Sequence, residues 1–501
     1  MIFESVENIT NKNFFIELVN VYIRLVEVTA ERNNITIPQM TDISEFTISE
    51  LIDMGLITKA EQISILCKVL SHEFSRFVNC VNFYITHKSF FDPFIKKLNN
   101  KERRNLQLKE QATSKPKFVD FFAGAGGLSC GFTQAGLKVE FANDFEEVCI
   151  HTYRFNHPEV PAENIVHDDI RKIVDNINDY IDSDIDIVVG GPPCQGFSSA
   201  NQQRIIDDPR NELYKYFIKA VIRLSPKFVV MENVRGMMKV ANQVVEDFEN
   251  IKISKNGIKY SYNVAYRLLN SVNFGVAQSR ERLIYIAVRN DVVDTHNITA
   301  SSVLDEICQS YQSEVPFTLN HALEAIKSLE APRIKNTNEI DSDISGKKID
   351  VNLFQGNENE YLVNINNNRE VPFLFNHKAR YVNDINYDIY RLLNQGDDAS
   401  DEKISGIMPY TNRLHCFKDK YYKLIADKPS RTITAHLRMD CHSHIHPFQV
   451  RAITPREAAR IQSFPDDYLF LGAYLKTYMQ IGNAVPCLMA KGIANIIKRY
   501  I

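Results

Sequence analysis

The stretch from Asp186 to Gly196, with the sequence DIVVGGPPCQG, constrains the fold of this chain more than any other. Its β-branched run stops at two glycines, which predicts a buried parallel strand that ends in a loop. In open α/β sheets, ligand sites gather at that end of the strands. Two prolines fix φ and remove backbone donors directly before Cys194, so they would hold its thiol in one place. This frame favours a nucleophile, although a cysteine taken alone is more often a small buried hydrophobe.

Composition places the chain among ordinary globular proteins. With 501 residues, of which 44% are hydrophobic and 24% charged, it can form two to four domains. Nine cysteines without repeated CxxC spacing, and no apolar signal segment at the N-terminus, favour a reducing cytoplasm and no structural disulfides. No apolar run has the length of a membrane span. The formal net charge of -4 gives no global sign of nucleic-acid binding, so any basic surface must be local.

The first part of the chain has the apolar spacing of helices, as in Phe14 and Leu18. Residues Thr47 to Glu50 and Thr58 to Glu61 match the pattern of capping boxes, with a hydroxyl at the N-cap and a glutamate three residues later. We therefore expect a helical domain over residues 1–112. Packing or interaction is its expected role, and regulation or nucleic-acid binding is the alternative.

The segment from Asn99 to Lys115 is polar and charged and ends at Pro116, which predicts a linker. Every motif that carries chemistry comes after Pro116. The helical domain is therefore expected to be dispensable for chemistry, so that a chain starting near Ser114 should fold and remain active.

A short apolar strand from Lys117 to Phe122 is followed by glycines at positions 124, 126 and 127 and then by a helix. A strand, a glycine turn and a helix bring backbone N–H groups close to a ligand, as in nucleotide-type cofactor sites. Asp144 follows the next strand, and Asp169 follows a further one. Such carboxylates can accept hydrogen bonds from a ribose or an adenine amino group, although singly each is more often a cap or a solvated turn. Their order along the chain favours the site.

A second pair of strand ends carries a carboxylate and two arginines. The strand from Pro226 to Met231 ends at Glu232, and if it lies beside the Cys194 strand, the carboxylate faces the same pocket. Arg280 and Arg282 precede another strand, and in an extended chain they share one face. Cys194 and Glu232 are thus the pair to test as nucleophile and acid.

The chain resembles the DNA cytosine-5 methyltransferases, because it carries motifs similar to theirs in the same order. The segments that carry the resemblance are residues 120–127, 191–195, 232–234 and 278–282, and, similar to the last two motifs of the family, residues 451–466 and 480–486. The resemblance covers Lys117 to Ile501 and is specific because several modest motifs occur in one fixed order. The N-terminal helical domain lies outside it.

The resemblance implies an α/β fold with a doubly wound, Rossmann-like catalytic lobe, a smaller target-recognition lobe and the N-terminal α-helical domain. The implied boundaries are 117–290 for the catalytic domain that binds S-adenosylmethionine, 291–430 for the target-recognition region and 431–501 for a C-terminal return that completes the catalytic lobe.

The resemblance also assigns chemistry to individual residues. Cys194 is implied as the nucleophile that adds to cytosine C6, Glu232 as the partner of N3 and the amino group, and Arg282 as a contact to the base carbonyl oxygen. A free cysteine has a pKa of about 8.5, so positive charge from Arg280 and Arg282 is expected to favour the thiolate. The alternative role of both arginines is structural pairing with Glu232.

The implied cofactor is S-adenosylmethionine, and no metal is expected. The residues implied to hold the cofactor are Phe122, Gly124, Gly126 and Gly127 in the turn, Asp144 at the ribose, Phe145 stacked on adenine, Asp169 and Ile170 at the adenine edge, Pro192, and Asn483 and Val485 closing the pocket. The glycine spacing departs from that of nicotinamide dehydrogenases. Methyltransferases that act on amino groups need no cysteine after their prolines.

The implied partner is double-stranded DNA, with the target cytosine flipped out of the helix. A cognate restriction endonuclease acting on the same site is a further implied partner, and a cytoplasmic monomer is expected. One rival is a tRNA cytosine-5 methyltransferase, whose Cys-Phe-Thr signature is not matched at Cys416-Phe417-Lys418. The other is a catalytically silent DNA-binding protein, against which the intact Cys194 and Glu232 speak.

Between the catalytic motifs, residues 376–380 and 411–414 carry side chains suited to DNA contacts but stay unassigned. His442, His444 and His446 would share one face of a strand, without the paired spacing of a structural zinc site. A basic surface for DNA phosphates is the preferred interpretation. Its members would be His436, Cys441 and these histidines with Arg431, Arg438, Arg451, Arg456 and Arg460.

Overall fold

A seven-stranded sheet forms the centre of the chain after Pro116, with the strand order β3-β2-β1-β4-β5-β9-β8. The first five strands in this order are parallel, and β9 is antiparallel to both of its neighbours, β5 and β8. Their bounds are β1 Lys117–Phe121, β2 Lys138–Asp144, β3 Ile165–His167, β4 Ile187–Gly190, β5 Phe228–Val234, β8 Tyr262–Asn270 and β9 Glu281–Arg289. Strand order reverses between β1 and β4, which is the point where open α/β sheets bind ligands.

The computed structural model describes residues 1–39, 43–91, 93–193, 211–255, 257–312, 315–335, 337, 339–354, 356, 359–409 and 420–501. Apolar clusters cover both faces of the sheet, as a doubly wound fold requires. On one face lie α6 Gly127–Gln134, α7 Glu147–Asn156, α11 Asn290–His296, α12 Ala300–Ser310 and α18 Cys487–Ile497. On the other face lie α8 Ile170–Asp175, α9 Glu212–Leu224 and α10 Ala241–Glu249. The predicted α/β class is confirmed.

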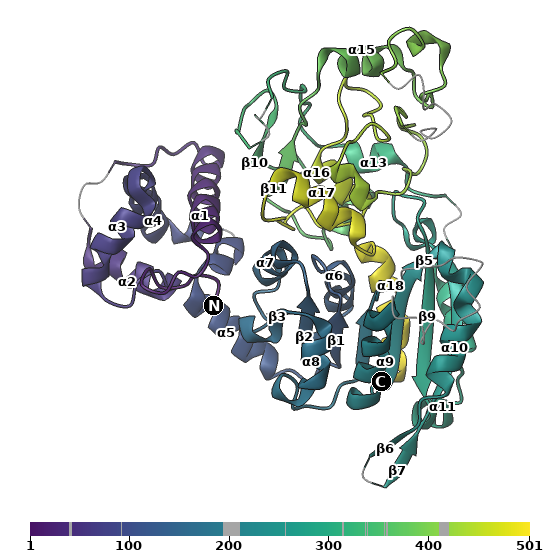
Figure 1. Cartoon of the computed structure of the whole chain (residues 1–501). Coiled ribbons are helices and arrows are strands. Elements are labelled where there is room, and N and C mark those ends of the chain that lie inside the picture. Colours follow the sequence, from purple (N-terminus) through teal and green to yellow (C-terminus); the bar gives the residue numbers. More distant parts are fainter. Residues whose placement is uncertain are drawn as a thin grey trace.

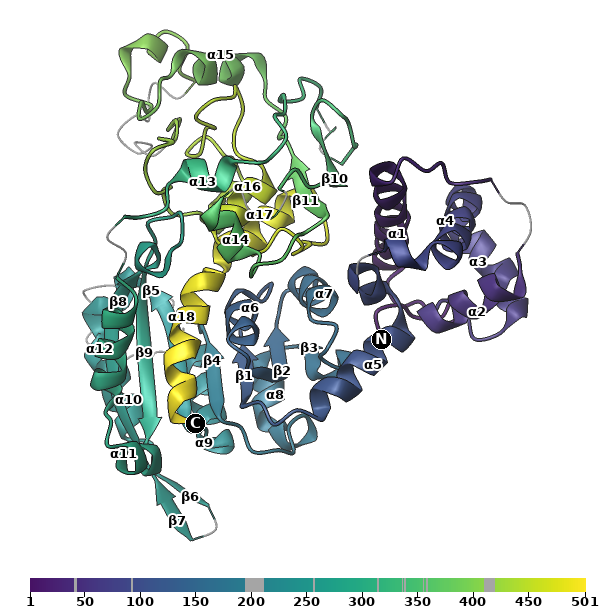
Figure 2. The same cartoon turned by 180° about the vertical axis from the view of Figure 1, so that it is seen from behind.

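A second lobe lies above the ends of the parallel strands and contains little regular structure (Figure 1). Its elements are α13 Leu319–Leu323, β10 Gly346–Val351, α14 Glu360–Ile365, β11 Phe373–Lys378 and α15 Asp384–Leu392. Two further helices, α16 Pro455–Ile461 and α17 Tyr474–Asn483, lie in this lobe beside β11, while α18 runs back along the sheet next to α6 (Figure 2). The C-terminal segment therefore contributes to both lobes, whereas the sequence predicted only completion of the catalytic one.

The N-terminal segment is helical, as predicted. Its helices are α1 Lys12–Arg32, α2 Glu45–Met54, α3 Ile63–Leu70, α4 Phe74–Thr86 and α5 Asn100–Gln111. The predicted linker after Asn99 is wrong, because that segment forms α5. The Asn99 side chain caps the helix by accepting from the Glu102 N–H, and Arg103 is fully buried against the rest of the protein.

Both predicted capping boxes are also wrong. Helix α2 begins three residues earlier than the pattern suggested, so Ser44 is the N-cap and its hydroxyl accepts from the Thr47 N–H. The Thr58 N–H donates to the Gln62 side chain, and a short 3-10 turn, Ala60–Gln62, precedes helix α3. Ser44 thus takes the N-cap position predicted for Thr47, and Gln62 accepts from the Thr58 N–H in place of Glu61.

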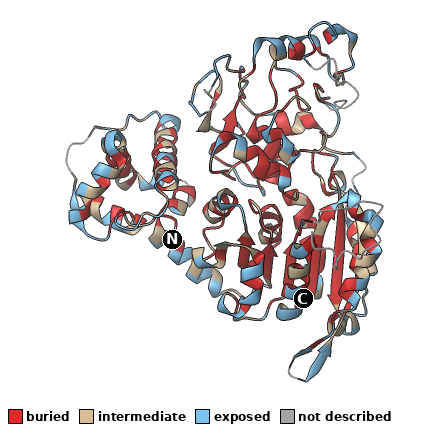
Figure 3. Ribbon diagram, viewed as in Figure 1, coloured by how far each residue is buried: buried red, intermediate tan, exposed pale blue. Residues whose placement is uncertain are grey.

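Burial is concentrated in the sheet and in helices α16 and α17, which are red in Figure 3. Helix α16 is buried along its whole length, including its charged residues. In the described part of the chain, no helix is long and apolar enough to cross a membrane.

Candidate active site

The ends of β4 and β5 bring the proline loop and Glu232 together. The two strands are parallel neighbours with Gly190 opposite Met231, so Gly191 and Glu232 follow at the same edge. A Cβ atom added to Gly191 would lie 3.0 Å from Glu232 Oε2, so the carboxylate reaches the root of the loop. The Asn233 amide donates to the Pro192 carbonyl over 3.0 Å and ties the loop to β5. Cys194 itself lies outside the described residues, which end at Pro193 and resume at Asn211.

Arg282 forms an ion pair with Glu232. Arg282 lies opposite Val234 in the antiparallel pairing of β5 and β9, two residues along from the carboxylate. Its Nε atom is 2.6 Å from Glu232 Oε1, and both side chains are mostly buried. The guanidinium therefore fixes the position of the carboxylate at the mouth of the site, as the structural alternative for this arginine predicted.

Arg280 does not share this position. It lies just before β9 and is buried, and its guanidinium donates to the carbonyls of Ile433 (2.5 Å) and Gly482 (3.0 Å). Burial lowers the pKa of Arg280, while the two carbonyl oxygens stabilise the charged form. Arg280 thus joins the sheet to the C-terminal segment, and it makes no ion pair with Glu232 among the described residues.

The predicted glycine turn lies between β1 and α6. Phe122, Gly124 and Gly126 all have positive φ, which is unusual for a phenylalanine and indicates a tightly constrained turn. The Gly124 N–H donates to Asp144 Oδ2 over 2.8 Å, so the carboxylate holds the turn. No atom lies within 4 Å of a Cβ added to Gly124, whereas one added to Gly127 would lie 2.5 Å from the Val485 carbonyl oxygen. The turn is therefore closed by the C-terminal segment at one end and open at the other.

Asp144 and Phe145 lie at the end of β2, next to this turn. Burial raises the pKa of Asp144, although the N–H groups of Glu146 and Gly124 donate to its carboxylate and oppose the shift. Phe145 is 70% exposed, and its backbone carbonyl accepts from His167 Nε2 over 2.9 Å. An exposed ring on a fixed backbone can stack on a planar ligand. Together with the open turn, this arrangement fits a nucleoside-type cofactor.

The remaining predicted cofactor residues are divided between the site and the core. The Asp169 carboxylate caps α8 and pairs with Arg171 at 2.5 Å, so it acts as the cap that the sequence allowed. Ile170 is buried in the core. Asn483 is exposed at the end of α17, close in sequence to Val485, which contacts the turn.

Two contacts to the site were missed by the sequence reasoning. Asn233 could have been found, because it directly follows Glu232 at the strand end. Tyr468 donates to the Ala125 carbonyl in the glycine turn over 2.5 Å. Nothing in the local sequence predicts this second contact, because 343 residues separate the two positions.

The predicted basic surface is wrong for three of its arginines. Arg451, Arg456 and Arg460 are fully buried. Arg451 pairs with Glu457, and Arg460 pairs with Asp466 over 2.7 Å. These arginines belong to the core of the second lobe because each guanidinium finds a carboxylate or several carbonyls there.

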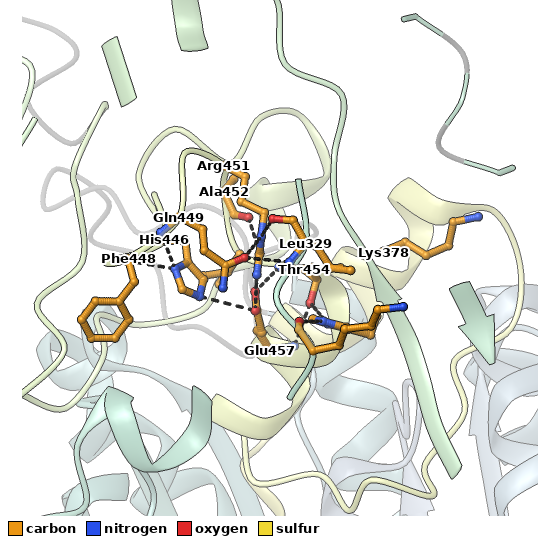
Figure 4. A network of polar contacts seen from close by, with 12 residues as sticks. Leu329, Lys378, His446, Phe448, Gln449, Arg451, Ala452, Thr454 and Glu457 are labelled. Atoms are coloured by element: carbon orange, nitrogen blue, oxygen red, sulfur yellow. Dashed lines mark hydrogen bonds and ion pairs between the residues drawn. The ribbon is translucent and has the colours of Figure 1, made fainter. Parts of the chain in front are cut away.

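Figure 4 shows Glu457 between the Arg451 guanidinium and the His446 ring. Its carboxylate accepts from Arg451 over 2.6 and 2.8 Å and from the Thr454 N–H over 2.7 Å. Burial lowers the pKa of His446 to about 3, so this ring is neutral. The histidine segment is also not a strand, and no group of three or more His, Cys, Asp or Glu suited to a metal occurs in the described ranges.

Residues 376–380 are likewise structural. The Asn376 amide bonds to the backbone of Phe470, and Arg380 donates to backbone carbonyls, including that of Met439 at 2.7 Å. Residues 373–378 form β11, which is buried throughout. These side chains are therefore already paired within the protein. The segment 411–414 lies outside the described residues.

The sheet order, the open glycine turn and the Glu232 carboxylate at the root of the proline loop define a doubly wound α/β protein with a nucleoside-type cofactor site, the class to which methyltransferases belong. A family model for C-5 cytosine-specific DNA methylases matches residues 116–499. The chain therefore belongs to this family and is a DNA (cytosine-5-)-methyltransferase. The match begins where the N-terminal helical domain ends, so that domain is an addition to the family fold.

Similar proteins agree with this assignment. The chain is 32% identical over 397 residues to the type II methyltransferase M.DdeI of Desulfomicrobium norvegicum, covering 76% of this chain and 88% of the relative. It is 30% identical over 390 residues to M1.HphI of Haemophilus parahaemolyticus, covering 76% and 86%. A crystal structure described as a prophage-encoded DNA modification methyltransferase of E. coli has the same fold, with a TM-score of 0.56, 23% identity and coverage of 77% and 99%.

Proposed function

We propose that the enzyme transfers a methyl group from S-adenosylmethionine to C5 of a flipped-out cytosine, in a specific sequence of double-stranded DNA, through a covalent adduct of Cys194. The observation that carries this proposal is the 3.0 Å approach of Glu232 Oε2 to the Gly191 Cβ position. It puts a carboxylate at the root of the loop that continues to Cys194, as acid-assisted nucleophilic addition requires.

The chemistry explains why these residue types are needed. Cytosine C5 is a poor nucleophile, but a bond from the Cys194 thiolate to C6 makes C5 an enamine-like carbon. Glu232 would assist by holding a proton at N3, and Arg282 would contact the base carbonyl oxygen. After C5 is methylated, its proton leaves and the thiolate departs from C6. Arg280 would act indirectly, through the C-terminal segment that it binds.

The cofactor site is assigned to the glycine turn and the end of β2. Gly124 and Gly126 would approach the cofactor, Asp144 would accept from the ribose and Phe145 would stack on adenine. Asp169, which caps α8, would lie with Ile170 at the adenine edge. When bound, S-adenosylmethionine would supply an electrophilic methyl group. The open space at Gly124 and the exposed Phe145 ring support this assignment.

We assign sequence choice to residues 291–430, because the residues assigned to catalysis would contact only the flipped cytosine and account for no readout of the bases around it. Exchange of this interval with that of a type II relative should change the methylated sequence. If the parental sequence is still methylated after the exchange, the assignment fails.

The relatives M.DdeI and M1.HphI are named type II methyltransferases. Their names support a restriction endonuclease that acts on the same site as a partner of this enzyme.

The covalent step can be tested with a cytosine that cannot lose its C5 substituent. Duplex DNA carrying 5-fluorocytosine at the target, mixed with S-adenosylmethionine, should give a complex that survives denaturing electrophoresis, because fluorine cannot leave as a cation. Cys194→Ala should give none, and Glu232→Gln should form the complex far more slowly. A complex that persists in Cys194→Ala would refute the nucleophile.

The same experiment separates the rivals. A tRNA methyltransferase would trap fluorinated RNA and leave the duplex free. A silent DNA-binding protein would bind the duplex without any covalent complex. A DNA that the enzyme methylates but does not trap would refute the covalent mechanism.

A further inference from the structure

Helix α7 connects the cofactor site to the N-terminal domain. The helix begins at Glu147, two residues after Phe145, and the Glu146 N–H that precedes it donates to Asp144 over 2.8 Å. A shift of α7 would therefore move both the carboxylate and the exposed ring assigned to the cofactor. What fixes α7 also fixes this half of the site.

The N-terminal domain contacts the first half of α7. The Phe14 ring of α1 stacks on the His151 ring, with centroids 3.6 Å apart and planes 11° apart. The Asn11 amide donates to Glu147 Oε1 over 3.2 Å. Burial lowers the pKa of His151, so its ring is neutral near pH 7 and stacks without a charge to desolvate.

The second half of α7 is held from α5 and the segment before it. The buried Arg103 guanidinium donates to the Arg154 carbonyl over 2.6 Å, close to the end of α7. Phe94 packs against Phe155 with ring centroids 5.7 Å apart. The domain thus holds α7 at both ends, and both sets of contacts come from residues outside the family match.

The charge of the domain gives no competing explanation. Residues 1–112 contain nearly equal numbers of acidic and basic side chains, so they lack the surplus of positive charge expected of a DNA-binding module. Its apolar cluster instead includes Phe155 from α7 and Leu469 and Leu471 from the C-terminal segment. The N-terminal domain therefore packs against the rest of the protein through this cluster.

We propose that the N-terminal domain is a positioning element of the cofactor site, with Phe14 as the positioning residue that holds α7 through His151. This inference rests on the proposed assignment of Asp144 and Phe145 to the cofactor. It replaces the expectation that the domain is dispensable, which was based only on where the motifs begin.

The test uses the full chain and S-adenosylhomocysteine as the probe, so that binding is measured without methyl transfer. Phe14→Ala should raise the dissociation constant about three- to tenfold, the scale of one aromatic pair. Amide hydrogen exchange in residues 147–156 should become faster. Phe14→Tyr should restore both values because it keeps the stack. Phe46→Ala is the matched control, since Phe46 is 76% exposed on α2 and should change neither.

The partner ring gives an independent check. His151→Ala should produce the same two changes, and the double variant should add little to either single one. If the dissociation constant and the exchange of α7 stay unchanged in both single variants, the proposal is refuted. If DNA remains unmethylated while the probe binds and both effects occur, the proposed function fails and the positioning role stands.

Discussion

Glu457 illustrates how single residues hold the second lobe together. Burial alone would raise the pKa of this carboxyl, but the Arg451 guanidinium outweighs burial and holds the pKa well below its ordinary range. Neither side chain has any exposed surface. The pair joins helix α16 to the segment before it, and Arg451 also reaches the Leu329 carbonyl. Removing one partner would leave the other charge buried and unpaired.

We therefore predict that Glu457→Gln lowers the free energy of unfolding by about 3–5 kcal/mol, as measured by urea denaturation. Because the folded pKa is depressed, the difference from wild type should be present above about pH 4.5 and shrink as the pH falls below it. Glu370→Gln is the control, because its pair with Arg32 is exposed and long at 3.5 Å, and its loss should cost less than about 1 kcal/mol. Equal losses in both variants would contradict the prediction.

Asp120 has the opposite behaviour. It is buried at the end of β1, where its carboxylate accepts from the Ser129 hydroxyl over 2.6 Å. Burial raises its pKa to about 7. The folded state therefore binds a proton that the unfolded state has lost, so this group reduces stability as the pH rises from about 4 to about 7.

Asp120→Asn should remove this dependence while keeping an acceptor for Ser129. Between about pH 5 and pH 7, the free energy of unfolding of wild type should fall relative to the variant by up to about 1.4 kcal/mol per pH unit. Above about pH 7 the difference should be constant. Denaturant unfolding at several pH values measures it, and a difference that does not change with pH would show that the carboxyl is not buried in this way.

At the scale of elements, helices α6 and α18 approach each other closely at a position that the sequence does not predict. A Cβ added to Gly131 would lie 2.4 Å from the Cys487 carbonyl oxygen and 2.5 Å from the Ala490 Cβ. Glycine is required here for close packing and not for its φ. The contact sets how the C-terminal segment returns to the sheet, and with it the position of Val485 at the glycine turn.

Gly131→Ala should therefore be destabilising by about 1–3 kcal/mol or more, although alanine is the better helix former. It should also weaken binding of S-adenosylhomocysteine, because the Val485 backbone moves with α18. Calorimetry and binding titration measure the two effects. Gly406→Ala is the control, since no atom lies within 4 Å of its Cβ position. A Gly131→Ala protein as stable as wild type would refute the packing argument.

At the scale of the whole molecule, the N-terminal domain shares one apolar cluster with the rest of the chain. Phe94 packs against Phe375 with ring centroids 5.1 Å apart. On α1, the Glu17 carboxylate accepts from the Gly472 N–H over 2.8 Å and pairs with Lys348 of β10. The domain thus contacts elements of both lobes.

A chain that begins at Ser114 should consequently expose Phe155, Phe375 and Leu471, which this cluster buries. We predict a lower thermal transition temperature, and aggregation on size-exclusion chromatography, because a contiguous apolar patch exposed to solvent promotes association. Addition of residues 1–112 as a separate chain should restore solubility. A truncated chain that stays monomeric with an unchanged transition would show that the shared cluster contributes little.

The sequence by itself determined the family, and also the order along the chain of the strand ends that carry candidate functional residues. The glycine turn, the Gly-Gly-Pro-Pro loop and Glu232 were predictable because each is a local pattern in which turn chemistry and strand periodicity agree. The ends of parallel strands also meet at one edge of the sheet, so the residues at these ends could be assigned to one site from the sequence alone.

Only the tertiary structure decided which charged residues face solvent. Arg451, Arg456 and Arg460 have the composition of a DNA-contacting surface, but each finds buried partners far along the chain. The same holds for α5. Its polar sequence predicted a linker, but the segment is a helix whose Arg103 is buried against α7. The carboxylates that pair with Arg451 and Arg460 are six residues away, but the carbonyls that complete their burial come from distant segments, which local sequence does not contain.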